Sequence, residues 1–165
     1  INAQLPYTAT GSVGLTLYTP GGISDTHYID IASTAPAVFR SGAAGPLTGL
    51  ATVVRAANNQ LATPANPVRR GDVLVIYLTG LGATAPAVIE GEAAPSSPLA
   101  VAVERPSVTL GGRSLPVEYA GLTPGLAGVY QINVRVTDDV PAGLNVPLRI
   151  EQSGGATAVE LRVVH

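Results

Sequence analysis

Few residues of this sequence could carry out acid, base or nucleophilic chemistry. The 165 residues include two histidines and no cysteine, and one histidine, His165, is the final residue. A Ser-His-Asp triad needs a histidine placed between a nucleophile and a carboxylate. His27 has Asp25 and Asp30 close to it in the sequence, but no Gly-x-Ser-x-Gly turn occurs that would present a nucleophile. The pattern favours a solvent-facing histidine at the start of a strand.

Two pairs of acidic residues are the remaining candidates for a reactive or metal-binding centre. Glu90 and Glu92 flank one glycine, and paired carboxylates serve glycoside hydrolysis when a cleft separates them by about 5 to 9.5 Å. Their stretch is rich in proline and alanine, which is typical of a solvated loop. Asp138 and Asp139 open a turn, where aspartates commonly cap backbone N–H groups. Calcium is the alternative for this second pair, although no EF-hand pattern is present. We expect no enzyme, no cofactor and no bound metal.

The composition excludes several classes of partner. Nine arginines, no lysine and eleven acidic residues give a net charge of −2, and only 12% of the residues are charged, compared with about 25% in an ordinary soluble domain. Such a surface has no electrostatic footprint for nucleic acid. No apolar run approaches the roughly 18 residues that span a bilayer, so no membrane insertion is expected. With no Trp, one Phe and six Tyr, a glycan is retained only as an alternative ligand.

Short runs between glycines and prolines predict strands, and no segment has a clean helical period. Residues 73–78 are apolar throughout, which predicts a central strand buried on both faces. Tyr77 and Tyr130 are expected to fill the core. The pattern indicates an all-β fold, an Ig-like antiparallel β-sandwich. Alternation of apolar and polar residues predicts half-buried strands at residues 13–18, 28–31, 117–119 and 159–163, and further strands are expected at 51–55, 107–110, 129–136 and 145–151.

The two ends of the sequence resemble each other. The first 34 residues match the last 34, and in the second copy this three-strand unit ends a domain. We therefore predict that residues 1–34 are the C-terminal strands of an incomplete Ig-like module and that residues 35–165 are a complete Ig-like β-sandwich. A first residue other than Met predicts a processed chain or a fragment of a longer one. The matching pieces are residues 1–5, 13–17 and 21–24, which reappear as residues 132–136, 146–150 and 154–157.

Several glycine-containing motifs of the second part carry a family resemblance. They are residues 121–134 (Gly-Leu-Thr-Pro-Gly-Leu-Ala-Gly-Val-Tyr-Gln-Ile-Asn-Val), 66–67 (Asn-Pro), 77–82 (Tyr-Leu-Thr-Gly-Leu-Gly) and 108–112 (Val-Thr-Leu-Gly-Gly). These motifs resemble the Solibacter-type uncharacterised C-terminal domain of acidobacterial secreted proteins. Residues 1–7 resemble the end of the Ig-like (IPT/TIG-like) module that commonly precedes it. The resemblance implies a secreted β-sandwich and brings no catalytic residues with it.

Strands that lack a facing sheet expose an apolar face and unpaired edge groups, which are a template for pairing with another chain. Residues 1–34 are therefore expected to pack on the same chain, to add to a neighbouring subunit, or to belong to a longer parent. Head-to-tail strand exchange between copies would build an open filament or surface layer. The predicted assembly interface comprises Ile1, Leu5, Val13, Leu15, Leu17, Ile29 and Ile31.

Gln131 and Asn133 share one face of their predicted strand, because they alternate with Ile132. Polar side chains that are buried need partners, so this pair is expected to fasten a neighbouring loop or, alternatively, to line a seam between domains or subunits. The preferred hypothesis is a processed, extracellular or cell-surface structural protein that polymerises with itself. The alternative is a non-catalytic adhesion, glycan-binding or spacer module of a larger secreted or cell-surface protein.

Overall fold

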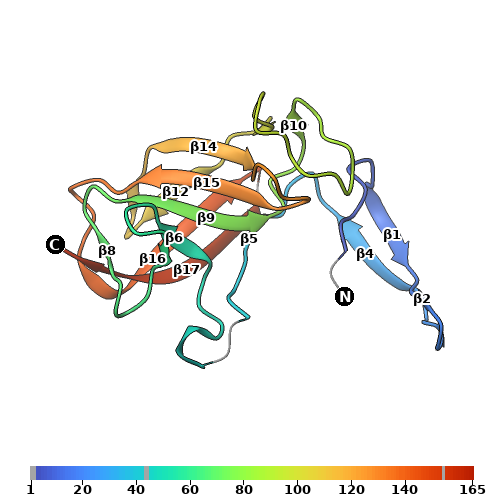
Figure 1. Ribbon diagram of the computed structural model, residues 1–165, viewed down its shortest axis with the longest axis horizontal. Helices are drawn as coiled ribbons and strands as arrows, with labels where there is room; N and C mark the ends of the chain where they lie inside the picture. Colours follow the sequence, from blue (N-terminus) through green and yellow to red (C-terminus); the bar gives the residue numbers. More distant parts are fainter. Residues whose placement is uncertain (1–2, 43–44, 154) are drawn as a thin grey trace.

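The computed structural model is almost entirely β-structure (Figure 1). It describes residues 3–42, 45–153 and 155–165. Within these residues the only helical segment is the short turn η1 (Gly45–Leu47), in an alanine- and glycine-rich stretch. Two larger sheets share one hydrophobic core, and the prediction of an all-β sandwich is confirmed.

The larger sheet has eight strands, and its paired strands are antiparallel. Their order is β10-β11-β14-β15-β9-β6-β7, and β5 also pairs with β9. The apolar strand β9 is therefore central, as predicted. The bounds are β5 (Ala37–Val38), β6 (Val53–Arg55), β7 (Gln60–Leu61), β9 (Val73–Thr79), β10 (Thr84–Ala85), β11 (Val101–Ala102), β14 (Val117–Leu122) and β15 (Tyr130–Arg135).

The smaller sheet has five strands in the order β13-β12-β16-β17-β8. Its centre is a long antiparallel hairpin formed by β16 and β17, which we call the closing hairpin. The short strand β8 pairs with β17 in the parallel direction. The bounds are β8 (Val68–Arg69), β12 (Ser107–Leu110), β13 (Arg113–Ser114), β16 (Gly143–Gln152) and β17 (Gly155–Val164).

The side chains of β9 alternate between a buried inner face and a half-buried outer face. The prediction that residues 73–78 are buried on both faces is therefore wrong, because the smaller sheet covers only one side of the larger one. Tyr77 lies on the outer face and does not fill the core, whereas Tyr130 is 4% exposed and does, as predicted. The inward-facing residues of β9 are Leu74, Ile76 and Leu78.

A buried ion pair closes the end of the sandwich where β6 and β9 meet the loop between them. Arg55 donates from Nε and Nη2 to the two carboxylate oxygens of Asp72, at 2.8 and 3.0 Å. Its Nη1 donates to Asn66 Oδ1 at 2.7 Å, and Asn66 Nδ2 donates to the Leu61 carbonyl. Because these charged groups are paired and hydrogen-bonded, we expect the network to stabilise this end of the sandwich.

A second hairpin, the N-terminal hairpin, projects from one end of the sandwich (Figure 1). It consists of β1 (Gly11–Leu15), β2 (Tyr18–Thr19), β3 (Gly22–Ile23) and β4 (His27–Ile31). None of the described strands of the two larger sheets pairs with it. The division into residues 1–34 and 35–165 stays a prediction, although the strands fall on either side of that boundary.

One strand of the predicted three-strand unit does not form. Residues 3–6 make no strand, whereas their counterparts in β15 pair with β9 and β14. The reason is physical: a strand needs hydrogen-bonding strands along its edges, and no described strand pairs with residues 3–6. Each end of the chain forms a hairpin, and the predicted repeat between the two ends stays a prediction.

Candidate functional site

The N-terminal hairpin is the feature that most resembles a binding surface, and its turn explains why it forms. Residues 19–22 read Thr-Pro-Gly-Gly, and Gly22 has a φ of +136°, which residues other than glycine rarely adopt. The Thr19 hydroxyl donates to the Gly22 carbonyl and accepts from the Gly21 N–H, each at 3.2 Å. The turn sets the register, with Tyr18 opposite Ile23 and Val13 opposite Ile29.

One face of this hairpin carries apolar residues, two of which are exposed. Leu15 and Leu17 are 41% and 43% exposed, although they alternate with polar or small residues as core-facing residues do. Val13, Ile29 and Ile31 are half-buried. We call these five residues the apolar face of the hairpin, and all of them belong to the predicted assembly interface.

The closing hairpin of the sandwich has the same local register as the N-terminal hairpin. Tyr18 pairs with Ile23 and Thr19 with Gly22, as Glu151 pairs with Ala156 and Gln152 with Gly155 at the matching positions of the sequence. The counterparts of Val13, Leu15 and Leu17 face the core and are at most 5% exposed. These counterparts are Val146, Leu148 and Ile150. Farther from the turn the registers differ by one residue, because Leu15 pairs with His27 whereas Leu148 pairs with Val159, the counterpart of Thr26.

The other predicted interface residues precede the hairpin. Leu5 is 36% exposed and lies in the segment that forms no strand, so it is not a strand residue of the apolar face. Ile1 lies outside the described residues.

Gln131 and Asn133 lie together on the outer face of the larger sheet, half-buried, as their alternation predicted. Gln131 Nε2 donates to Asn133 Oδ1 at 3.1 Å. This hydrogen bond joins the two side chains to each other, and none of the hydrogen bonds found among the described residues joins either side chain to a neighbouring loop. Their assignment to a seam stays a prediction.

The candidate catalytic residues are not brought into a centre. His27 is exposed on β4, as predicted, and none of the ion pairs among the described residues includes it. Glu90 and Glu92 are exposed in a loop, where Glu90 Oε1 accepts the Tyr7 N–H at 3.0 Å. This contact holds the segment before β1 against the loop.

Asp138 and Asp139 lie in the turn between β15 and β16 and are exposed, as predicted. Asp139 Oδ2 lies 3.7 Å from Arg113 Nε. No group of three or more potential metal ligands is found among the described residues. In that part of the chain, no helix is both long and apolar enough to cross a membrane.

Sequence reasoning missed the contacts that hold the segment before β1. Besides the bond to Glu90, Gln4 Oε1 accepts the Gly91 N–H at 3.0 Å. These partners lie far apart in the sequence and on loops, so no periodic pattern predicts them.

No protein-family model, curated protein or solved structure matches the chain. The resemblance noted in the sequence stays a prediction.

Proposed function

We propose that the protein is a non-catalytic structural component of an extracellular or cell-surface assembly, in which the N-terminal hairpin joins its β-sandwich to a second one. The observation that carries the proposal is the exposed apolar face on a hairpin that has the register of the closing hairpin beside its turn. In the second sandwich, the N-terminal hairpin would take the place that the closing hairpin takes in the first.

The physical reason is that an isolated two-stranded hairpin is at best marginally stable in water. A facing sheet would cover Leu15 and Leu17, and full burial of a side chain of this size contributes about 1.5–3 kcal/mol. A flanking strand would pair the free edge groups of β1 or β4. The second gain requires a partner made of β-strands.

The partner that fits best is a β-sandwich that lacks its own closing hairpin. In a second intact copy of this chain the corresponding place is already filled by β16 and β17, which lie at the centre of the smaller sheet. The N-terminal hairpin would have to displace a hairpin whose core-facing residues are fully packed. We therefore favour an end-to-end array of unlike sandwiches, with the hairpin as the shared element.

A filament of identical copies is the second candidate. The matching pairs beside the two turns favour it. The β1–β4 ladder opposes it, because it is shifted by one residue relative to the β16–β17 ladder and a domain swap requires equivalent pairing. Adhesion or glycan binding by the loops stays a prediction of the sequence.

The test is a photo-crosslinker placed at Leu15 or Leu17 in the natural full-length protein. We expect crosslinks to apolar residues in strands of a β-sandwich, identified by mass spectrometry of the joined peptides. Crosslinks to residues of β12, β8 or β9 in another copy of this chain would instead establish the swapped filament.

The control is the same crosslinker at Thr10, which is exposed but precedes β1. Equal crosslinking from Thr10 and Leu15, or none from either leucine, would refute a role for the apolar face. As a second test, we expect Leu15→Asp/Leu17→Asp to abolish assembly in sedimentation and electron microscopy, with the sandwich still folded. Thr8→Asp/Thr10→Asp adds the same charge off the face and should leave assembly unchanged.

A further inference from the structure

The segment that connects the N-terminal hairpin to the sandwich, residues 33–36, lies against the turn after β9. Ala35 N donates to the Gly80 carbonyl at 2.8 Å. A Cβ atom on Gly80 would lie 1.9 Å from the Ala35 carbonyl oxygen, and one on Gly82 would lie 2.6 Å from that of Ser33. Both glycines have positive φ, +83° and +77°. This turn therefore has the shape that admits the connecting segment and would exclude it if either residue had a side chain.

The same segment also contacts the smaller sheet. Thr34 is only 8% exposed, and its hydroxyl donates to the Gln152 carbonyl at 3.3 Å. Gln152 in turn donates from Nε2 to the Leu81 carbonyl at 3.2 Å and to that of Glu104. Pro36 is buried beside Gly155. The connecting segment is thus held between the ends of both sheets, whereas a flexible linker would run through solvent.

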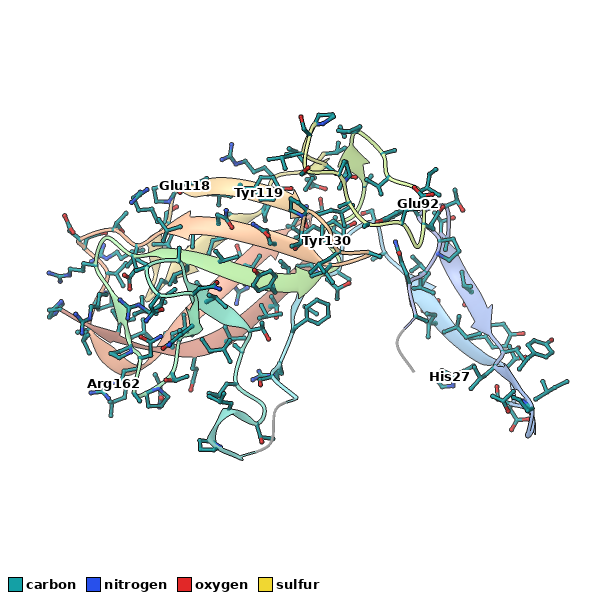
Figure 2. All side chains as sticks on the ribbon, viewed as in Figure 1. His27, Glu92, Glu118, Tyr119, Tyr130 and Arg162 are labelled. Atoms are coloured by element: carbon teal, nitrogen blue, oxygen red, sulfur yellow. The ribbon has the colours of Figure 1, made fainter. Side chains whose placement is uncertain are left out.

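The other end of the hairpin is held as well. Before β1, Gln4 and Tyr7 are bound by Gly91 and Glu90 at 3.0 Å each. Nearby, the Tyr130 hydroxyl donates to the Gly82 carbonyl. Figure 2 shows Tyr130 and Glu92 at the end of the sandwich that faces the hairpin. The chain is therefore attached on its way into the hairpin and on its way out.

We propose that the turn at residues 80–82, together with Tyr130 and Gln152, is a socket that locks the hairpin to the sandwich in one orientation. Attachment at two separated points removes the rotation that a single tether leaves free. Whatever the hairpin joins is then held at a fixed angle to this sandwich. The motif Thr79-Gly80-Leu81-Gly82 would then hold the hairpin at a fixed angle, a role that goes beyond the proposed function.

The test is the distance distribution between spin labels on the hairpin and on the sandwich, measured by double electron–electron resonance. The chain has no cysteine, so Asp25→Cys and Glu160→Cys, both at exposed positions, give two unique labels. We expect one narrow peak for the otherwise natural chain. A broad distribution there would overturn the proposal. The measurement needs no partner, so its outcome is independent of whether the hairpin completes a second sandwich.

Two changes should remove the narrow peak. Gly82→Ala places a methyl group against the connecting segment, and its control is Gly112→Ala, which has nearly the same φ (+78°) but no atom within 4 Å of the added carbon. Gln4→Ala/Glu90→Ala removes both bonds before β1 without touching the core, and its control is Glu92→Ala in the same loop.

The outcomes are separable even if Gly82→Ala fails to fold, which circular dichroism would reveal. Loss of the narrow peak in the test variants, with a narrow peak in both controls, supports the socket. A peak that stays narrow in Gln4→Ala/Glu90→Ala and in folded Gly82→Ala refutes it, and equal broadening in a control and its test variant does the same.

Discussion

Tyr130 is a neutral phenol that must keep its proton while it is buried. Burial, together with Tyr7 beside it, raises the pKa of Tyr130 well above its ordinary value of 10.0, and burial also raises the pKa of Tyr119. The folded chain therefore holds these protons at pH values at which the unfolded chain releases them. Their contribution to stability is complete below about pH 10 and is lost as the pH rises above it.

We predict that the free energy of unfolding is steady from pH 7 to about pH 10 and then falls. The chain has no lysine or cysteine, so neither of these residue types contributes to the fall. Tyr130→Phe should flatten the fall and cost about 1 kcal/mol at neutral pH, because a hydrogen bond is lost. Tyr28→Phe, at a 71% exposed position, should change neither. Urea unfolding at several pH values checks this, and an undiminished fall in Tyr130→Phe would contradict it.

The buried pair of Arg55 and Asp72 makes a second prediction at this scale. Both side chains are 10% exposed, so Asp72→Ala leaves a buried guanidinium without its counter-charge. We expect a loss of about 3–5 kcal/mol in the free energy of unfolding. The exposed pair of Arg135 and Glu118 provides the control. Glu118→Ala should cost at most about 1 kcal/mol, and equal losses in urea unfolding would show that the buried pair is not special.

At the scale of elements, the two hairpins place similar residues in opposite surroundings. Leu148 is fully buried, whereas its counterpart Leu15 is 41% exposed. We predict that Leu148→Ala lowers the stability of the isolated chain by about 2–5 kcal/mol, whereas Leu15→Ala changes it by about 0.5 kcal/mol or less. Thermal unfolding of both variants checks the contrast. A large cost for Leu15→Ala would mean that the apolar face is already covered in the isolated chain.

Strands were the part of the fold most accessible from the sequence. The strands predicted at residues 145–151 and 159–163 form as β16 and β17, and one face of each strand is buried while the other is solvated. The uniform apolarity of residues 73–78 misled, since valine and tyrosine also suit the half-buried outer face of a sheet. Whether a strand is buried on one face or on both depends on what packs against each face of its sheet. The strand's own sequence does not encode this.

The candidate surface was partly predictable for the same reason. The sequence predicted Val13, Leu15 and Leu17 as interface residues, because they alternate with other residues as in a strand and match apolar residues near the other end of the chain. Leu5 did not join them, because the strand expected there has no pairing partner in the described chain. The contacts of residues 33–36 with the turn at residues 80–82 depend on glycines whose positive φ values no periodic pattern reports.

At the scale of the whole molecule, stability rests on one core, and the described residues offer no cluster of metal ligands. We therefore predict that EDTA changes neither the melting temperature nor the assembly of the protein. Scanning calorimetry with EDTA and with added calcium checks this. A rise of several degrees with calcium would instead place a cation site at Asp138 and Asp139.

The position of the connecting segment has a mechanical consequence. The chain end beyond β17 and the N-terminal hairpin lie at opposite ends of the longest axis (Figure 1), and β17 begins beside Pro36. A pulling force between the two ends would therefore run along β17. In an antiparallel ladder the hydrogen bonds lie across the strands, so such a load would shear the β16–β17 ladder as a whole instead of opening it one bond at a time.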